Sequence, residues 1–131
     1  MRAAPGAGVG AVVEESAYAD LPVLLKGEIP DFVRFGRFLR PAILLAGRLF
    51  PDFDPWDVLP KNDAAKLSDE RVPLFIIHST EDTIVPYEQA KILAAAYPDS
   101  RVWRLEGYAH VEAFRHPEYA QRLRAFLKAS R

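Results

Sequence analysis

Residues 72–114 decide the fold, and they read VPLFIIHSTEDTIVPYEQAKILAAAYPDSRVWRLEGYAHVEAF. The run Val72–His78 is almost continuously apolar and has the length of a strand, which is typical of a central parallel strand covered on both faces. Tyr87–Tyr97 is rich in helix formers and follows Pro86, a residue suited to the first turn of a helix. After a turn, Arg101–Leu105 predicts a second strand. Strand, helix and strand at this spacing predict a parallel sheet.

The sequence on either side extends this pattern. Val9–Glu15 (VGAVVEE) predicts a short buried strand, and Glu118–Ala129 predicts a final helix with one apolar face. In between, apolar side chains recur at helical spacing in Asp31–Arg40 and Ala42–Phe50, and a short helix is expected near Asn62–Ser68. The predicted fold class is therefore α/β, with about three parallel strands, flanking helices and a helical insertion.

Composition excludes several classes of function. The 131 residues are enough to bury a core, and 17 basic against 18 acidic side chains give a formal net charge of −1. Such a chain offers no basic field for nucleic acid. Because cysteine is absent, disulfides, thiolate nucleophiles and cysteine metal sites are excluded. The apolar runs are too short for a membrane span and residues 1–16 do not resemble a signal peptide, so we expect a soluble, cytoplasmic protein.

Two polar positions follow the two strongest strands. Val72–His78 leads into Asp82, and Arg101–Leu105 leads into His110. Because the carboxyl ends of neighbouring parallel strands meet at one edge of a sheet, we expect the carboxylate and the imidazole to lie close together. Such a pair suits acyl transfer, in which a carboxylate orients a histidine that acts as general base and acid.

The stretch 72–114 also resembles a known family, the α/β-hydrolase-fold serine hydrolases. In that family a buried strand leads to G-x-x-D-x-x-V-P, which carries the acid of a catalytic triad, and a later G-x-x-H loop carries the histidine. Matched residue by residue, the acid falls on Asp82, with Val85 and Pro86 in register, and the histidine falls on His110 after Gly107. AVVEESAYADL at 11–21 resembles the strand and turn that follow the nucleophile half of these enzymes.

The resemblance implies three parts and shows two departures. Residues 1–20 correspond to a strand and turn of the hydrolase core, 21–70 to a helical cap or lid, and 71–131 to a C-terminal unit with the acid and the histidine. Ser79 stands where the family has a glycine, and we expect it to crowd the turn. The nucleophile motif G-x-S-x-G surrounds none of the five serines, and the family's chain order places it upstream of Met1.

The function implied by the resemblance is hydrolysis of an ester, thioester, amide or peptide bond by a Ser-His-Asp triad. Asp82 would orient His110, which would activate an upstream serine and then protonate the leaving group. The substrate would be a small molecule or peptide with an acyl group, and no metal or organic cofactor is required. The chain alone is expected to be inactive, because the serine and the oxyanion-hole amides are missing. The cap pattern does not define the substrate.

Several alternatives remain open for individual residues. Asp82 is also suited to capping the helix after Pro86, and Glu81 and Asp20 compete as the triad acid. His78 is expected to be structural or to line the site wall, and His116 to begin a helix. The spacing of the histidines does not favour zinc. Core packing and an acyl-binding lid explain the insertion's aromatic side chains equally well: Phe32, Phe35, Phe38, Phe50, Phe53 and Trp56.

Two other functions remain open for the whole chain. The first is a non-catalytic interaction module, because a strand at Val9–Val13 without a neighbour would present an unpaired edge. That edge would favour self-association or complementation by a separate N-terminal half. The second is different chemistry on the same fold, because dehalogenases and other relatives keep the acid and the histidine but differ at the nucleophile.

Overall fold

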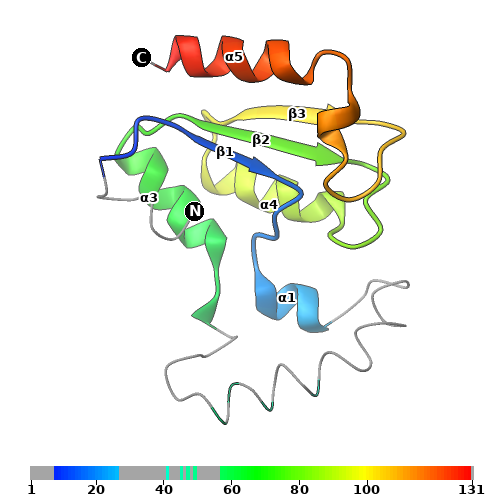
Figure 1. The fold of residues 1–131 in the computed structure, drawn as a ribbon. Coiled ribbons are helices and arrows are strands. Elements are labelled where there is room, and N and C mark those ends of the chain that lie inside the picture. Colours follow the sequence, from blue (N-terminus) through cyan, green and yellow to red (C-terminus); the bar gives the residue numbers. More distant parts are fainter. Residues whose placement is uncertain are drawn as a thin grey trace.

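The three predicted strands form one parallel sheet. The computed structural model describes residues 8–26 and 57–130, together with the single positions 41, 45, 47 and 49. Strands β1 (Val12–Glu15), β2 (Leu74–Ser79) and β3 (Arg101–Leu105) pair in the order β1-β2-β3 (Figure 1). The predicted α/β class is therefore confirmed. β1 begins three residues later than expected, and β2 extends one residue further, to Ser79.

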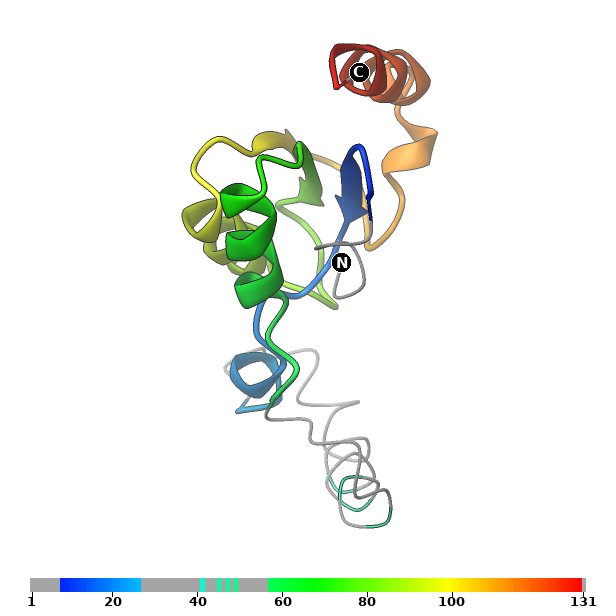
Figure 2. The same ribbon diagram turned by 90° about the vertical axis from the view of Figure 1, so that its left-hand side faces the viewer.

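Helices cover both faces of this sheet. The helices are α1 (Leu21–Lys26), α3 (Pro60–Asp69), α4 (Tyr87–Ala96) and α5 (Tyr119–Ala129), with a short 3-10 helix η2 (Ala113–Arg115) before the last one. In Figures 1 and 2, α3 and α4 lie on one face and α5 lies on the other. The proposed helix Asp31–Arg40, most of Ala42–Phe50 and the six aromatic residues of the insertion lie outside the described residues, so the cap at 21–70 stays a prediction.

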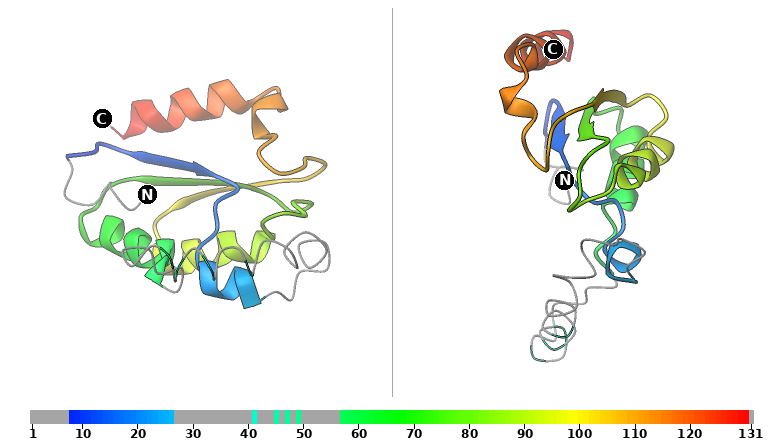
Figure 3. Two further views of the ribbon diagram at one scale, coloured as in Figure 1. Left: turned by 60° about the horizontal axis from the view of Figure 1, so that its bottom comes forward. Right: turned by 90° about the vertical axis from the view of Figure 1, so that its right-hand side faces the viewer.

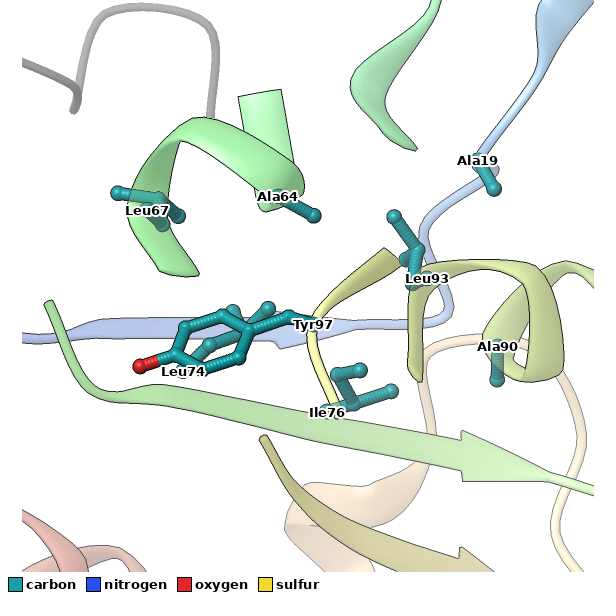
Figure 4. Close-up of a cluster of buried hydrophobic side chains, with 8 residues drawn as sticks. All are labelled: Ala19, Ala64, Leu67, Leu74, Ile76, Ala90, Leu93 and Tyr97. Atoms are coloured by element: carbon teal, nitrogen blue, oxygen red, sulfur yellow. The ribbon is translucent and has the colours of Figure 1, made fainter. Parts of the chain in front are cut away.

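Strand β2 is the centre of the core because its side chains supply both faces. All six of its residues are buried, as its apolar sequence predicts. Leu74 and Ile76 pack toward α3 and α4 with Leu67 and Leu93, all of them at most 1% exposed (Figure 4). Burial of each such aliphatic side chain contributes about 1.5–3 kcal/mol relative to an exposed position.

The opposite face of the sheet carries an aromatic cluster under α5. The ring of Phe75 lies 6.4 Å from that of Trp103 and 5.1 Å from that of Phe126, measured between centroids. The guanidinium of Arg122, on α5, lies 4.7 Å from the centroid of Trp103 and forms a cation–π contact with it. These contacts fix α5 against β2 and β3.

The register of β2 and β3 brings two loops together. Ser79 pairs with Leu105, so the last residues of both strands lie side by side. The backbone N–H of Thr80 then donates to the carbonyl of Leu105 at 2.9 Å, which continues the pairing by one residue. The loops after β2 and β3 therefore begin at the same edge of the sheet (Figure 3), as expected for parallel strands.

Candidate active site

Asp82 is held rigidly by its own loop. Its Oδ1 accepts hydrogen bonds from the backbone N–H groups of Ile84 and Val85, both at 2.9 Å, and its side chain is 0% exposed. Pro86 precedes the first residue of α4, and no side chain caps that helix. The alternative that Asp82 caps the helix is therefore wrong: its carboxylate closes the turn before Pro86 instead. A buried carboxylate that accepts two N–H groups is fixed in orientation.

The histidine pairs with the other oxygen of the same carboxylate. His110 Nδ1 lies 2.8 Å from Asp82 Oδ2, and the His110 side chain is 27% exposed. Because an ionised carboxylate only accepts hydrogen bonds, Nδ1 carries the hydrogen and Nε2 of the neutral ring is the acceptor. The structure thus brings together the two residues that the sequence singled out. The partly exposed ring is accessible from outside the protein.

Further hydrogen bonds tie the two loops to each other. The hydroxyl of Ser79 donates to the carbonyl of Tyr108 at 2.5 Å and accepts from the N–H of Glu81 at 3.2 Å. The carboxylate of Glu81 accepts from the N–H of Gly107 at 2.8 Å. Gly107 has φ +79°, a left-handed conformation that glycine adopts without strain. Ser79 was expected to crowd this turn, whereas its hydroxyl links the acid loop to the histidine loop.

The end of β1 makes contacts that the sequence analysis did not anticipate. Ser16 Oγ accepts from the N–H of Val111 at 3.2 Å, and Glu15 Oε1 accepts from the N–H of Ala113 at 2.8 Å. The partners lie 95 and 98 residues apart in the chain. Polar residues at the end of a buried strand are the only sequence signal for these bonds, and that signal does not identify the partners.

His78 lies directly beside the acid. Its side chain is fully buried, its Nε2 donates to the carbonyl of Val85 at 2.8 Å, and the same nitrogen is 3.6 Å from Asp82 Oδ2. Its Nδ1 has no hydrogen-bond partner among the described residues. The ring also contacts the edge of Tyr87 on α4. Of the two roles considered from the sequence, these contacts favour the structural one.

Asp20, Glu81 and His116, the other candidates from the sequence, make hydrogen bonds outside the Asp82–His110 pair. Asp20 Oδ1 accepts from the N–H of Val23 at 3.0 Å, where α1 begins, and Asp20 Oδ2 pairs with Lys61 Nζ at 2.5 Å. Glu81, as described above, binds Gly107. His116 directly follows η2, and its Nδ1 accepts from the N–H of Glu118 at 3.1 Å. Because α5 begins only at Tyr119, the prediction that His116 begins a helix is wrong.

A cavity of about 510 Å³ opens between β1 and α3. It is lined partly by Glu14, whose Oε2 accepts from the N–H of Ala17 at 3.0 Å, while Oε1 is buried without a hydrogen-bond partner among the described residues. Burial raises the pKa of the Glu14 carboxyl to about 8, the neighbouring charge of Glu15 acts in the same direction, and the Ala17 N–H opposes both. Neither Asp82 nor His110 lines this cavity.

Within the described part of the chain, no three histidine, cysteine, aspartate or glutamate side chains gather into a cluster that could hold a metal ion. None of the helices in that part combines the length and the apolar character that crossing a membrane requires.

Comparison with known proteins gives one informative match. No family model matches the chain. Over 80 residues, or 60% of the chain, the sequence is 38% identical to a pimeloyl-[acyl-carrier protein] methyl ester esterase of Aromatoleum aromaticum (strain DSM 19018 / LMG 30748 / EbN1). The match spans 29% of that protein, so the chain covers less than a third of its relative's length. Together with the parallel sheet, this similarity confirms the resemblance inferred from the motifs at 72–114.

Proposed function

We propose that this chain, as a relative of the α/β-hydrolases, supplies the acid and the histidine with which a hydrolase cleaves an acyl bond. The observation that carries the proposal is the 2.8 Å contact between His110 Nδ1 and Asp82 Oδ2 at the carboxyl ends of two adjoining parallel strands. The similarity to an esterase supports the same class of reaction.

In the proposed mechanism each atom of the pair has a role. Asp82 fixes the ring of His110 in the tautomer with hydrogen on Nδ1, so that Nε2 can take a proton from a nucleophilic hydroxyl. When the ring becomes positively charged, the buried carboxylate stabilises it, and the ring then protonates the leaving group. Two backbone N–H groups on Asp82 Oδ1 hold the carboxylate in place during this cycle.

The nucleophile is proposed to be a serine that lies outside these 131 residues. None of the five serines in the sequence stands in a G-x-S-x-G motif. In the proposed enzyme a preceding segment provides this serine together with the oxyanion-hole amides, and the 131-residue chain alone is inactive. No metal or organic cofactor takes part in this mechanism.

The proposed substrate class is taken from the name of the similar protein. The similar protein is named for a methyl ester of a pimeloyl group on a carrier protein. We therefore propose an ester with an acyl group as the substrate of the whole enzyme, ahead of a thioester, an amide or a peptide.

A chimera tests this proposal. The segment of the Aromatoleum aromaticum esterase that matches this chain is replaced by the corresponding 80 residues of the chain, and hydrolysis of a short p-nitrophenyl ester is measured. We expect turnover, and we expect Asp82→Asn and His110→Ala each to lower kcat by at least about 10³-fold. Glu106→Gln, a change at an exposed position, is the matched control and should leave kcat within a few-fold of the unmodified chimera.

Two outcomes would reject the assignment. The first is a chimera in which His110→Ala has no effect on turnover. The second is robust hydrolysis by the isolated 131-residue chain that survives the same substitution, because the reaction would then not pass through this histidine.

A second candidate function rests on the position of β1. Within the described residues, β1 lies at one end of the sheet and pairs only with β2. We propose that its other edge pairs with β1 of a second copy of the chain, or with a separate N-terminal half, as an interaction module. Light scattering on the purified chain checks the first arrangement, and a stable monomer at high concentration speaks against it.

A further inference from the structure

The backbone around His110 is strained in one place. Val111, the next residue, has φ 55°, a left-handed conformation that is unusual for a β-branched side chain. Such conformations persist only where surrounding contacts enforce them, and they gather at functional sites. The question is which contacts hold the histidine loop in this form.

The contacts come from Glu15, the last residue of β1, and from Ser16, the residue that follows it. Ser16 Oγ accepts from the N–H of Val111 itself, and Glu15 Oε1 accepts from the N–H of Ala113 at 2.8 Å. In Figure 2 the loop between β3 and η2 passes close to the carboxyl end of β1. The loop is thus anchored at Val111 and Ala113, the first and third residues after His110.

The anchoring residues are themselves fixed. Ser16 has φ 54°, and its N–H donates to the carbonyl of Ile77 on β2 at 2.9 Å. Glu15 Oε2 accepts from the hydroxyl of Tyr119 at 3.5 Å, which connects it to α5. Burial, the charge of Glu15 and this hydrogen bond together raise the pKa of the Tyr119 hydroxyl, so that it stays a donor. Both anchors are therefore held by the sheet and by the last helix.

We propose that Glu15 and Ser16 form a clamp that positions His110 for its contact with Asp82, and that Glu15 is the main positioning residue. The inference rests on the proposed function, because it concerns the pair that performs the chemistry. The bond from Ala113 to Glu15 is charge-assisted, and such bonds are stronger than those between neutral groups. Without it, the strained turn at Val111 can relax and move the imidazole away from the carboxylate.

The experiment is NMR spectroscopy of the 131-residue chain with Glu15→Ala. Two signals are followed: the far-downfield resonance of the His110 Nδ1 proton, which Asp82→Asn identifies by removing it, and the amide hydrogen exchange of Ala113. We expect Glu15→Ala to abolish the His110 resonance and to accelerate exchange at Ala113 about ten- to hundredfold. Glu15→Gln keeps an acceptor oxygen and should restore the resonance.

Controls separate positioning from folding. Slow exchange at the Trp103 amide on β3 reports an intact sheet, and Glu106→Ala, which removes an exposed carboxylate, should leave all signals unchanged. If Glu15→Ala does not fold, Ser16→Ala decides, because it removes only the acceptor for Val111. Loss of the His110 resonance in that folded variant supports the clamp.

The failures of the two proposals are distinguishable. A folded Glu15→Ala variant that keeps the His110 resonance at its original position overturns the clamp and leaves the pair intact. Where Glu15→Ala does not fold, a folded Ser16→Ala variant that keeps the resonance has the same meaning. Absence of any such resonance in the unmodified chain, with no effect of Asp82→Asn, overturns the acid–histidine pair and the clamp with it.

Discussion

The buried carboxyl of Glu14 makes the stability of this protein depend on pH. Burial raises its pKa from 4.5 to about 8 in the folded chain. Because the folded pKa is the higher one, the stabilising effect is fully present below about pH 4.5 and is lost as pH rises through about 8. At 1.36 kcal/mol per pH unit, the loss amounts to about 3 kcal/mol at pH 7 and about 5 kcal/mol well above pH 8. Glu14→Gln keeps an acceptor for the Ala17 N–H and removes the titration.

Urea unfolding at several pH values tests this reasoning. At pH 4 the variant and the unmodified chain should have similar free energies of unfolding, and at pH 7 Glu14→Gln should be more stable by about 3 kcal/mol. Glu106→Gln, which removes an exposed carboxylate, should retain the pH dependence of the unmodified chain. A stability difference between Glu14→Gln and the unmodified chain that stays constant from pH 5 to pH 8 would falsify the assignment of a raised pKa to Glu14.

Three further substitutions test other parts of the structure, each by urea unfolding. Phe75→Ala removes a ring that is 1% exposed and packs on two other aromatic rings, so it should destabilise the fold by about 3–5 kcal/mol; a loss below 1 kcal/mol is incompatible with this packing. Val111→Asn places a residue that tolerates φ 55° at a half-exposed position and should stabilise by up to about 1 kcal/mol, whereas a clear loss contradicts strain there. His78→Phe leaves the carbonyl of Val85 without its donor and should cost about 1–3 kcal/mol; unchanged stability argues against the structural role of His78.

Local patterns in the sequence predicted most of the sheet and the acid–histidine pair. The apolar run at Val72–His78 and the helix formers at Tyr87–Tyr97 fix the elements, and their lengths place Asp82 and His110 at one edge. The two residues meet once β2 and β3 pair in parallel, and strands that are close in the sequence commonly pair.

The supporting contacts could not be predicted in the same way. Glu15 and Ser16 bind residues of the histidine loop that lie 98 and 95 positions away in the sequence. A glutamate or a serine at the end of a strand does not indicate which residue it will bind. Glu14 shares its cavity with residues of α3, which begins only at Pro60. The pattern of a strand predicts which side chains share a face of the sheet. It does not predict which helix or loop will pack on that face.

The pairing of β2 with β3 also determines whether the imidazole of His110 meets the carboxylate of Asp82. A shift of β3 by one residue would displace its loop by about 3.3 Å and would turn Trp103 and Leu105 to the wrong side of the sheet. Such a misaligned form loses its aromatic packing and its imidazole–carboxylate contact at once. Mutations that loosen this distant apolar layer should therefore reduce the fraction of molecules with the His110–Asp82 contact before they reduce the amount of folded protein.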